Sequence, residues 1–464
     1  MKFNRLGSVV TAILIIPAVL LCSQNSLIPA DTLTIGLIGD QTGSYDLSAT
    51  YQIMEKAVEQ MDAKNPDLVL HVGDLVESIR GINSFEDYKS NFDYAVNILN
   101  RLNAPWYLTA GDHDVAPPVY QAGSCDRSRE EWFQKLCSAA GLPMEKQLYY
   151  SFDFNNYHFI SLYSLENLHT DPRWGPIFLN QLSDEQIAWL KNDLEAHKNA
   201  PGIIVLVHQP HWYVWSNWSE IHQILRQYPV AAVIAGHFHY DQDDGMIDQI
   251  RYLVMGATGG VVKNMDPNSG GSSQFATLKL YKNKVTHINL FDLSSGESLE
   301  LTPRRTMDRL QALSCMLDNL FMDENIGRKN GQLFTITGEG QYSSLKQIGL
   351  ESLANPIDLP IRIKISTDRD ILQNPRWIRS GKSIPDSSFI ELEPGERTGW
   401  ANYTSVGQWA KPDPLWVCDL TGNPERLKDL TGIAITIKIS FTDQGERWVE
   451  STARFPVKKI EDNL

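Results

Sequence analysis

The sequence predicts an α/β layered domain followed by a small antiparallel β-sandwich. From Asp31 to about Asp292, short apolar strands alternate with helical stretches, and this alternation is typical of an α/β fold. Later runs, such as residues 360–366 and 432–441, alternate apolar and polar residues, as half-buried strands do. Two different hydrophobic patterns in one chain therefore indicate two kinds of folded unit.

The change of pattern sets the expected domain boundaries. A helical periodicity over residues 307–322 lies between the two kinds of strand pattern. We expect a leader at residues 1–30, an α/β domain at 31–298, and an accessory domain of one helix and a β-sandwich at 299–464. The sequence does not indicate whether the accessory domain anchors, shields or selects substrates.

Composition limits the kinds of partner. The chain has 464 residues, of which 42% are hydrophobic and 10% aromatic, so it can fold as a globular protein. Its formal net charge of -15 argues against nucleic acid as a partner, because a phosphate backbone calls for a basic face. An acidic protein can still bind a small phosphorylated molecule if metal ions make the local field positive.

The first residues predict export. Lys2 and Arg5 precede an apolar run at 7–21 that is too short and too Pro-interrupted for a membrane span but suits a signal peptide. Cys22 follows the run directly and resembles the lipidated cysteine of bacterial lipoproteins. Membrane attachment through Cys22 and ordinary cleavage before Asp31 both stay open, so we expect a periplasmic, extracellular or lipid-anchored protein.

Four cysteines remain after the leader is removed. In an oxidising compartment an even number favours disulfides. Cys125 with Cys137 is the expected bridge because the intervening loop is short, and Cys315 with Cys418 is the second expected pair. Four free buried cysteines are the alternative.

Residues that bind metal ions recur where the predicted strands end. Carboxyl ends of strands are where open α/β sheets place their sites, so these residues are expected to converge. The strands that begin at Leu33, Leu68, Pro105, Ile203 and Val233 run into Asp40, Asp74, Asp112-His113-Asp114, His208 and His237-Phe-His239, respectively.

The stretch from Val233 to His239 carries the clearest signal. A buried strand ends in Gly236, which lets the chain turn tightly enough for His237 and His239 to face two ions. Two surface histidines after a strand are the alternative interpretation. A Gly-Asp pair after a strand is, by itself, also often only a helix cap. It is the ordered set of five segments that favours a metal site.

This ordered set resembles the motifs of the calcineurin-like metallophosphoesterase superfamily. The family blocks are an Asp followed two residues later by His or Gly, then Gly-Asp, Gly-Asn-His-Asp/Glu, a lone His, and Gly-His-x-His. The resemblance covers about the first two thirds of the mature chain. It implies a four-layer α/β/β/α sandwich in which two packed sheets are flanked by helices.

The resemblance also implies a centre of two metal ions, of iron, manganese or zinc. Asp74 would bridge both ions, because one carboxylate has two oxygens. The other expected ligands are Asp40 and His239 for the first ion, and Asp112, His208 and His237 for the second. A water between the ions would attack phosphorus, His113 would donate a proton to the leaving oxygen, and Asp114 would orient the His113 imidazole.

Three departures from the family pattern bear on mechanism. Thr42 stands where many members have a histidine ligand. Glu77 stands where purple acid phosphatases have a tyrosine ligand, and it is expected either to bind the first ion or to start a helix as a solvated residue. Asp112 replaces an asparagine. Extra carboxylates would raise the pKa of a metal-bound water and disfavour phosphate dianions relative to diesters.

We therefore expect a metal-dependent phosphoesterase acting on phosphate mono- or diesters. The alternative is a metal- or ligand-binding protein that kept the scaffold without turnover, which Thr42 and Asp112 favour. Retention of His113 speaks against the alternative, because a pure binding protein needs no leaving-group acid. The sequence does not determine the oligomeric state.

Several aromatic and imidazole side chains near the predicted site have two interpretations. They could line the substrate site or belong to the core: His211, Trp212, Tyr213, Trp215 and Trp218. Three further histidines lie inside predicted strands and are expected in the core: His71, His158 and His287. Four C-terminal tryptophans are expected to fill the sandwich core, with sugar binding as the alternative: Trp377, Trp400, Trp409 and Trp416.

Overall fold

The computed structural model describes most of the two sheets, their helices and parts of the C-terminal region. The described residues are 32–43, 46–78, 81–116, 126–171, 175–179, 181–213, 216–262, 271–321, 334–337, 347–350, 355–367, 376–379, 382–384, 389–396, 415–418 and 433–455. The predicted leader and Cys22 lie outside them, as do Cys125, Trp215, Trp400 and Trp409. None of the helices within these ranges combines the length and apolar character needed to cross a membrane.

The first sheet has six strands in the order β14-β13-β12-β1-β2-β3. Strands β1, β2 and β3 are parallel, and β12 pairs antiparallel with β1, so the sheet is mixed. Its strands are β1 (Leu33–Ile38), β2 (Leu68–His71), β3 (Trp106–Leu108), β12 (Gln274–Tyr281), β13 (Lys284–Asp292) and β14 (Ser298–Leu299).

The second sheet also has six strands, in the order β10-β11-β9-β8-β5-β4. Strands β5, β8, β9 and β11 are parallel. At the two edges, β4 and β10 pair antiparallel with β5 and β11. Its strands are β4 (Tyr150–Phe154), β5 (Tyr157–Leu162), β8 (Ile203–Val207), β9 (Val230–Ala235), β10 (Gln242–Ile247) and β11 (Ile250–Val254). Strands β6 (Asn167–Asp171) and β7 (Gly175–Leu179) form a separate hairpin.

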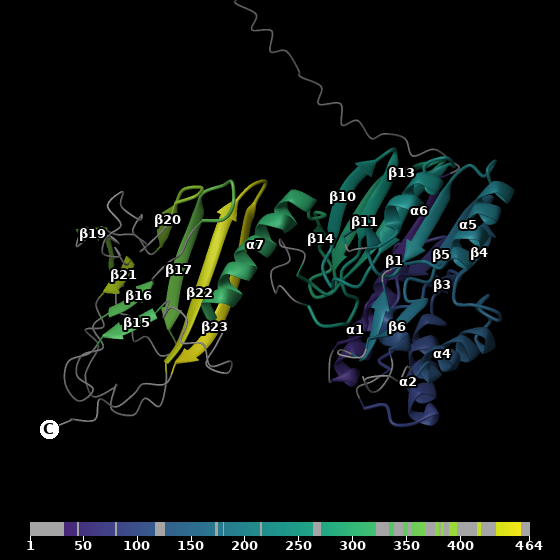
Figure 1. Cartoon of the computed structure of the whole chain (residues 1–464), viewed down its shortest axis with the longest axis horizontal. Coiled ribbons are helices and arrows are strands. Elements are labelled where there is room, and N and C mark those ends of the chain that lie inside the picture. The colour runs from purple at the N-terminus through teal and green to yellow at the C-terminus, as the bar shows by residue number, and fades with distance from the viewer. Residues whose placement is uncertain are drawn as a thin grey trace, which may run out of the picture.

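Helices cover the outer face of each sheet (Figure 1). They are α1 (Leu47–Asp62), α2 (Phe85–Leu99), α3 (Asp112–Val115), α4 (Ser128–Ala139), α5 (Asp184–Ala196) and α6 (Trp218–Leu225), with a 3₁₀ turn at His211–Tyr213. Side-chain caps start three of them: Asp46 accepts from Ala49 N, Ser84 from Asp87 N, and Ser183 from Gln186 N.

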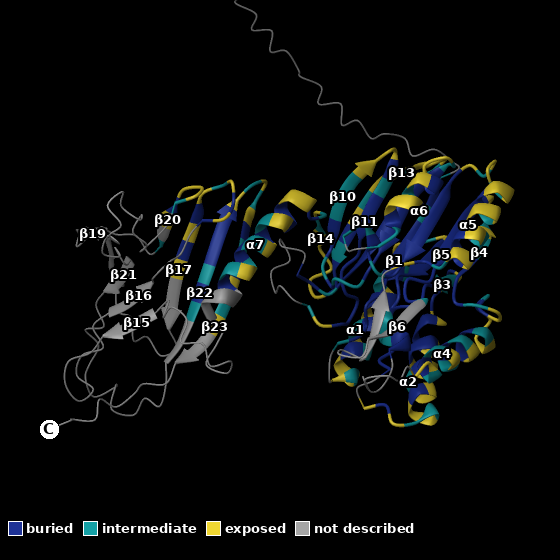
Figure 2. Ribbon diagram, in the orientation of Figure 1, coloured by how far each residue is buried: buried dark blue, intermediate teal, exposed yellow. Residues whose placement is uncertain are grey.

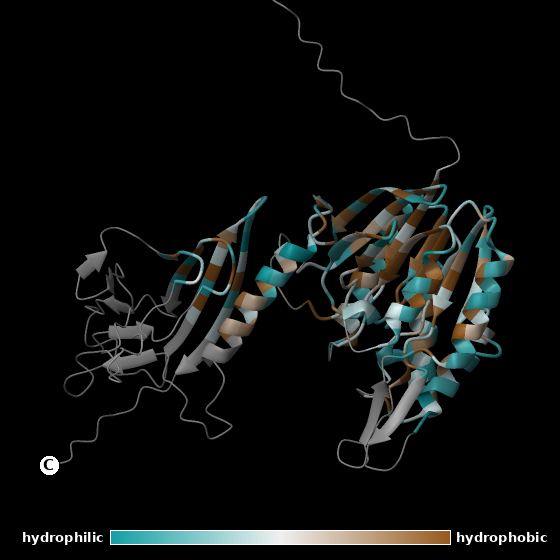
Figure 3. Cartoon of the chain, turned by 45° about the horizontal axis from the view of Figure 1, so that its top comes forward, coloured by the Kyte–Doolittle hydropathy of each residue, from teal (hydrophilic) through white to brown (hydrophobic). Residues whose placement is uncertain are grey.

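Three apolar interfaces hold the four layers together. The alternation of side chains along β1 places Ile35 and Leu37 between the sheets, where they meet Ile204, Leu206 and other residues of the second sheet. One further cluster fills the space under α1, α2 and α4, and another the space under α5 and α6. The central strands are accordingly buried and apolar, whereas the helices are exposed and polar on their outer faces (Figures 2 and 3). The predicted four-layer α/β/β/α sandwich is thus confirmed.

The C-terminal region contains helix α7 (Arg304–Phe321) and two antiparallel sheets. One sheet has the order β20-β17-β22-β23, with β17 (Ile361–Thr367), β20 (Ile390–Leu392), β22 (Ile433–Thr442) and β23 (Glu446–Phe455). The other has the order β15-β16-β21-β18-β19, with β15 (Phe334–Thr337), β16 (Gln347–Leu350), β18 (Arg376–Arg379), β19 (Lys382–Ile384) and β21 (Leu415–Cys418). These sheets agree with the predicted antiparallel β-sandwich.

Helix α7 connects the two regions, because it contacts both β10 and β23 (Figure 1). Gln311 donates a hydrogen bond of 2.6 Å to the Tyr240 hydroxyl on one side. On the other side Thr306 hydrogen-bonds to Asp443, in the turn between β22 and β23.

The two predicted disulfides and the predicted core position of His287 are wrong. Cys137 and Cys315 are both free cysteines, so neither expected disulfide is present. Cys137 is fully buried in the core under α1, α2 and α4, whereas Cys315 is exposed on α7. His287 is also exposed on β13 rather than in the core, while His71 and His158 are buried as expected.

Candidate metal centre

Tight turns follow the strands that carry the candidate ligands. Asp40, Asp74, His237 and His239 have φ values of 56°, 59°, 72° and 58°, in the left-handed region that non-glycine residues rarely adopt. Cross-strand hydrogen bonds hold these turns: Asp40 N donates to Gly73 O, and Gly236 N donates to His208 O, both at 2.9 Å. Strained backbone of this kind concentrates at functional sites.

Two glycines allow the ligands to approach one another closely. A Cβ atom at Gly236 would lie 2.4 Å from Asp40 Oδ2, and one at Gly111 would lie 2.2 Å from Asp74 Oδ1. Contacts this short do not occur between non-bonded atoms. The absence of a side chain at both positions therefore allows the carboxylates of Asp40 and Asp74 to face the interior of the site.

Asp112 joins the two sheets at the site. Its Oδ1 lies 2.9 Å from His208 Nε2 and 2.8 Å from His237 Nδ1. His208 Nε2 also lies 3.3 Å from Asp74 Oδ1, so the imidazole is shared between two carboxylates. The ligand atoms of Asp112, His208 and His237 are all within 4.8 Å of one another, and so are those of Asp40, Asp74 and His208.

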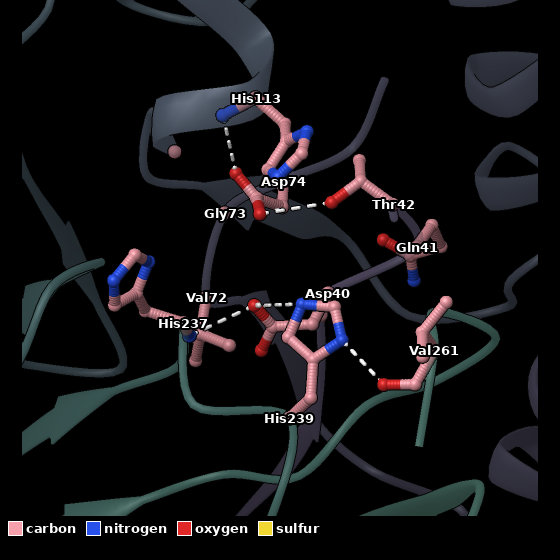
Figure 4. A network of polar contacts seen from close by, with 12 residues as sticks. Asp40, Gln41, Thr42, Val72, Gly73, Asp74, His113, His237, His239 and Val261 are labelled. Carbon is pink, nitrogen blue, oxygen red and sulfur yellow. Dashed lines mark hydrogen bonds and ion pairs between the residues drawn. The ribbon is translucent and has the colours of Figure 1, made fainter. Parts of the chain in front are cut away.

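Asp40 and the last histidine lie on the other side of the site (Figure 4). Asp40 Oδ1 accepts a hydrogen bond of 2.8 Å from the backbone N–H of His237. His239 Nε2 lies 3.9 Å from the same oxygen. The structure therefore gathers all six of these sequence-predicted residues in one place: Asp40, Asp74, Asp112, His208, His237 and His239.

Backbone carbonyls fix two of the imidazole rings. His208 Nδ1 donates to Val72 O at 2.8 Å, and His239 Nδ1 donates to Val261 O at 2.7 Å. Because a carbonyl oxygen can only accept, Nδ1 carries a proton in both rings, and Nε2 is the atom that each ring presents to the carboxylates. Histidines that bind metals are commonly held in this way.

The charges of the site fit bound cations. Asp40 is fully buried, and its Oδ2 has no hydrogen-bond partner in the described part of the protein. Burial and the nearby Asp74 charge raise the pKa of Asp40 well above its usual value. For Asp112, burial acts in the same direction, but the hydrogen bonds from His208 and His237 outweigh it and hold the pKa well below its usual value. A buried carboxylate oxygen without a partner is a position that a cation would satisfy.

Thr42 has a role that the sequence did not indicate. Its hydroxyl donates a hydrogen bond of 2.9 Å to Asp74 Oδ2 (Figure 4). Asp74 Oδ1 meanwhile accepts from the backbone N–H of His113 at 2.9 Å. Both oxygens of the expected bridging carboxylate are thus oriented by the protein, and the residue that replaces a family histidine holds this carboxylate in place.

Glu77 is not the solvated residue at a helix start that was one of its two expected roles, because its side chain is buried. Its buried carboxylate contacts His113, with 3.0 Å between Oε2 and the imidazole Nδ1. Burial lowers the pKa of His113, but the hydrogen bond that it donates to Glu77 and the charges of Asp74 and Asp112 raise it to about 9. The structure therefore pairs Glu77 with the candidate acid, and the prediction that Asp114 orients this imidazole is wrong.

Asp114 instead organises the backbone of the site. Its two oxygens accept hydrogen bonds from the backbone N–H groups of Asp74 at 3.0 Å, Val76 at 2.9 Å and Gly111 at 2.8 Å. Burial and the charge of Asp74 raise the pKa of Asp114 to about 8. Because these side-chain contacts are with backbone, Asp114 joins the loops after β2 and β3 and does not touch the His113 ring.

The aromatic side chains after His208 divide into core and site-facing groups. Trp218 is buried in the core under α5 and α6. Trp212 is partly buried and donates to Asp244 at 2.6 Å. Tyr213 lies edge-on to Phe238, the residue between His237 and His239, with 5.6 Å between ring centroids. Of these three side chains, Tyr213 is therefore the one that contacts the loop carrying His237 and His239.

His211 is fully buried, and neither ring nitrogen forms a hydrogen bond within the described residues. Burial and the nearby His237 lower its pKa to about 4, so the ring is neutral near pH 7. We find no hydrogen bond between His211 and the six gathered residues.

Known proteins are similar to parts of this chain. Residues 33–241 match the family model of the calcineurin-like phosphoesterases. Purple acid phosphatase 23 of Arabidopsis thaliana is 26% identical over 211 residues, which are 39% of this chain and 43% of that protein. The uncharacterized protein YvnB of Bacillus subtilis (strain 168) is 22% identical over 313 residues, 61% of this chain and 22% of that protein. The chain thus spans less than half the length of either relative.

Solved structures with a similar arrangement include a dimetal phosphatase from Danio rerio and a purple acid phosphatase from yellow lupin. The first is 16% identical with a TM-score of 0.40 and covers 58% of this chain and 98% of its own. The second is 13% identical with a TM-score of 0.40 and covers 60% of this chain and 55% of its own.

The match over residues 33–241 supports the calcineurin-like metallophosphoesterase superfamily that the sequence motifs predicted. This superfamily implies divalent metal ions as cofactors, and the structure contains groups of residues that can bind them.

Proposed function

We propose that this chain is a phosphoric ester hydrolase with a two-metal centre. The observation that carries the proposal is the convergence of three carboxylates and three imidazoles from five strand ends, around the unpartnered buried oxygen of Asp40. Asp40, Asp74 and His239 would hold one ion, and Asp74, Asp112, His208 and His237 the other. Such ions polarise a phosphoryl oxygen and lower the pKa of a bound water.

The protein's own residues supply the remaining functions. Thr42 and the His113 backbone N–H orient the two oxygens of Asp74, and Asp114 fixes the loop that carries Asp74. His113 would carry the proton that neutralises the leaving oxygen, because the Glu77 carboxylate stabilises its imidazolium form. Cations bound to Asp74 and Asp112 would weaken the stabilisation that these two carboxylates give to the protonated His113 ring. The stabilisation by Glu77 would remain.

We further propose that diesters are better substrates than monoesters. Three carboxylates face the site, and among the described residues no lysine or arginine forms an ion pair with Asp40, Asp74 or Asp112. Two divalent ions would therefore be largely neutralised by their ligands. A phosphomonoester dianion would gain less from this site than a diester, which carries a single negative charge.

Paired assays of an aryl phosphomonoester and an aryl phosphodiester test both statements. Metal-free protein is supplied with manganese, iron or zinc, and Asp74→Asn serves as the inactive reference. We expect hydrolysis only with metal, a higher kcat/KM for the diester, and a loss of about 10²-fold or more in Asp74→Asn. Hydrolysis that survives the substitution unchanged would contradict the two-metal assignment. Tight metal binding without hydrolysis would favour the binding protein instead.

Residues 1–21 support a proposal about location. Their basic start and apolar run suit export, with Cys22 as the candidate site of lipid attachment. Mass spectrometry of the protein purified from its native host tests this, because a lipidated Cys22 at a new N-terminus would distinguish anchoring from simple cleavage. We also propose residues 299–464 as an accessory unit attached to the hydrolase.

A further inference from the structure

A second group of histidines and aspartates lies far from the metal centre along the second sheet. Asp153 on β4 pairs across the hairpin with His158 on β5. Asp193 and His197 lie one turn apart at the C-terminal end of α5. His158 is the second residue of β5, whereas the metal centre follows the carboxyl ends of the parallel strands. The group therefore lies at the opposite end of the parallel strands from the metal centre.

His158 lies between two carboxylates. Its Nδ1 is 2.8 Å from Asp153 Oδ1, and its Nε2 is 2.8 Å from Asp193 Oδ2. Asp193 is itself fixed, because Ser151 Oγ donates to its Oδ1 at 2.8 Å. A carboxylate on the far nitrogen of a histidine orients the ring and makes the near nitrogen a better metal ligand. Asp193 is placed to do this for His158 Nδ1.

His197 presents its other ring nitrogen to Asp153. Its Nδ1 donates to the backbone carbonyl of Asp193 at 2.8 Å, so Nε2 keeps its lone pair. His197 Nε2 lies 3.8 Å from Asp153 Oδ2. The ligand atoms of Asp153, His158 and His197 are all within 4.8 Å of one another. Two imidazoles and one carboxylate are therefore gathered within reach of a common point.

We propose that Asp153, His158 and His197 bind one divalent transition-metal ion, preferably zinc, at a site separate from the metal centre. Two imidazoles, one carboxylate and a water complete the four ligands that zinc takes when one position stays open. The site is accessible from solvent, because the side chains of Asp153 and His197 are 62% and 31% exposed, whereas His158 is a buried anchor at 1%.

One movement is required for binding. The rings of His158 and His197 are stacked, with centroids 3.6 Å apart and planes inclined by 10°. A nitrogen lone pair lies in the plane of its ring, so two parallel stacked rings cannot both point at one ion. His197 must tilt out of the stack, and its partly exposed position at the end of α5 leaves room for this movement.

Counting bound zinc tests the proposal. The full-length protein and the variants His197→Gln and Asp153→Asn are dialysed against excess zinc at a fixed concentration, and zinc per chain is measured. His222→Gln is the matched control, because His222 also contacts a carboxylate, Asp248, at 3.2 Å but is in no group of three ligands among the described residues. We expect both test variants to bind one ion fewer than the parent, and the control to bind as many.

Hydrolase activity of the same samples separates the two sites. If the lost ion belongs to this site, kcat/KM in the presence of zinc stays within about two-fold of the parent. Equal zinc in parent and test variants would overturn the proposal, and so would a loss of zinc that removes activity in proportion. After either outcome, the contacts would be explained by a protonated His158 that bridges the Asp153 and Asp193 carboxylates.

A measurement on the unaltered chain avoids any effect of substitution on folding. Diethyl pyrocarbonate modifies accessible imidazole nitrogens, and peptide mapping reports each histidine. Zinc should protect His197 at least several-fold, while the exposed His287 continues to react at its original rate. Equal modification of His197 with and without zinc would contradict the proposed site.

Discussion

At the scale of single residues, the candidate acid and its partner show how neighbouring charges shape a site. His113 is only partly buried, yet its Nδ1 contacts the buried Glu77 carboxylate at 3.0 Å. A carboxylate beside an imidazole favours the charged ring, so the proton that His113 would donate is held by Glu77 as well as by the ligand charges. The contact is a specific target for substitution.

Glu77→Gln should shift the pH dependence of hydrolysis. Removing the charge lowers the pKa of His113, and an acid must be protonated to donate, so activity should be lost at lower pH than in the parent. We expect the alkaline limb of the kcat/KM profile to move down by about one pH unit. The metal content should not change. An unchanged limb together with lost metal would instead make Glu77 a ligand.

His71 should weaken the fold in acid. Its Nδ1 accepts from Gly73 N at 3.2 Å, and its Nε2 donates to Gln41 Oε1 at 2.6 Å. Burial, together with the charge of His208, lowers the pKa of His71 to about 3. In the unfolded chain the His71 imidazole takes up a proton as the pH falls below its ordinary pKa of 6.5. In the folded chain the ring stays neutral until about pH 3. Stability from the neutral ring is therefore complete above pH 6.5 and declines between these two values.

Urea unfolding at pH 7.5 and pH 5 measures this effect. His71→Asn should lose about 2 kcal/mol less than the parent between the two pH values, because it lacks the group that titrates. His287→Asn is the control, since that imidazole is exposed on β13. If the parent and His71→Asn lose equal stability, the buried neutral histidine is not the source.

At the scale of elements, the site is made by short turns at the carboxyl ends of strands. Asp40, Asp74, His237 and His239 have left-handed backbone, and a Cβ at Gly236 would lie only 2.4 Å from Asp40 Oδ2. The shape of the centre therefore depends on the absence of a Cβ atom at Gly236 as well as on the candidate ligands.

Gly236→Ala should reduce metal binding while the fold survives. The new Cβ would displace the Asp40 carboxylate, because the turn between β9 and His237 is held by the hydrogen bond to His208 O. We expect destabilisation of about 1–3 kcal/mol and at least a tenfold weaker metal affinity, measured by metal titration. Gly445→Ala is the control, since nothing lies within 4 Å of a Cβ there. Unchanged affinity in Gly236→Ala would refute this account.

Strand-end ligands could be predicted because the signal is local. An apolar run followed by Gly-Asp or Gly-His-x-His marks both the strand and the residue at its end, so Asp40, Asp74 and His237 could be found. The partner of His113 could not, because Glu77 and Asp114 are both acidic and lie at similar places in their loops. Only the direction of the side chains decides which one meets the ring.

Contacts between distant segments were equally hidden. The group at Asp153, His158 and His197 unites a hairpin with the end of a helix about forty residues later, and no short motif connects them. The prediction of disulfides was wrong for a related reason. An even number of cysteines says nothing about burial, and Cys137 points into the core under α1, α2 and α4.

At the scale of the whole molecule, α7 links the metallophosphoesterase region to the C-terminal sheets. Asp443 is central to this link, since it contacts Thr306 on α7, Arg447 at 3.3 Å and Arg309 at 3.8 Å. Its side chain is only 10% exposed. Removing this carboxylate would take a counter-ion from Arg447, whereas Arg309 would keep its 2.7 Å ion pair with Asp358.

Asp443→Asn should loosen the C-terminal region and spare hydrolysis. We expect the unfolding transition of this region to lose about 1–3 kcal/mol, because Arg309 and Arg447 lose a shared counter-ion in a partly buried place. Limited proteolysis should then cut near the link sooner, while kcat/KM of the metal-loaded protein stays near the parent value. Asp248→Asn, at an exposed ion pair with Arg226, is the control. Equal proteolysis of Asp443→Asn and the control would contradict the role of Asp443.

The spread of the ligands from Asp40 to His239 has a consequence for biosynthesis. Chain emerging from the ribosome presents Asp40, Asp74 and Asp112 first, and the imidazoles of β8 and β9 only after about another hundred residues. Until the second sheet is made and docked, the early carboxylates have no histidine partners. Binding of ions at the proposed centre would therefore be a late event of maturation, and nascent or prematurely terminated chains would bind metals poorly.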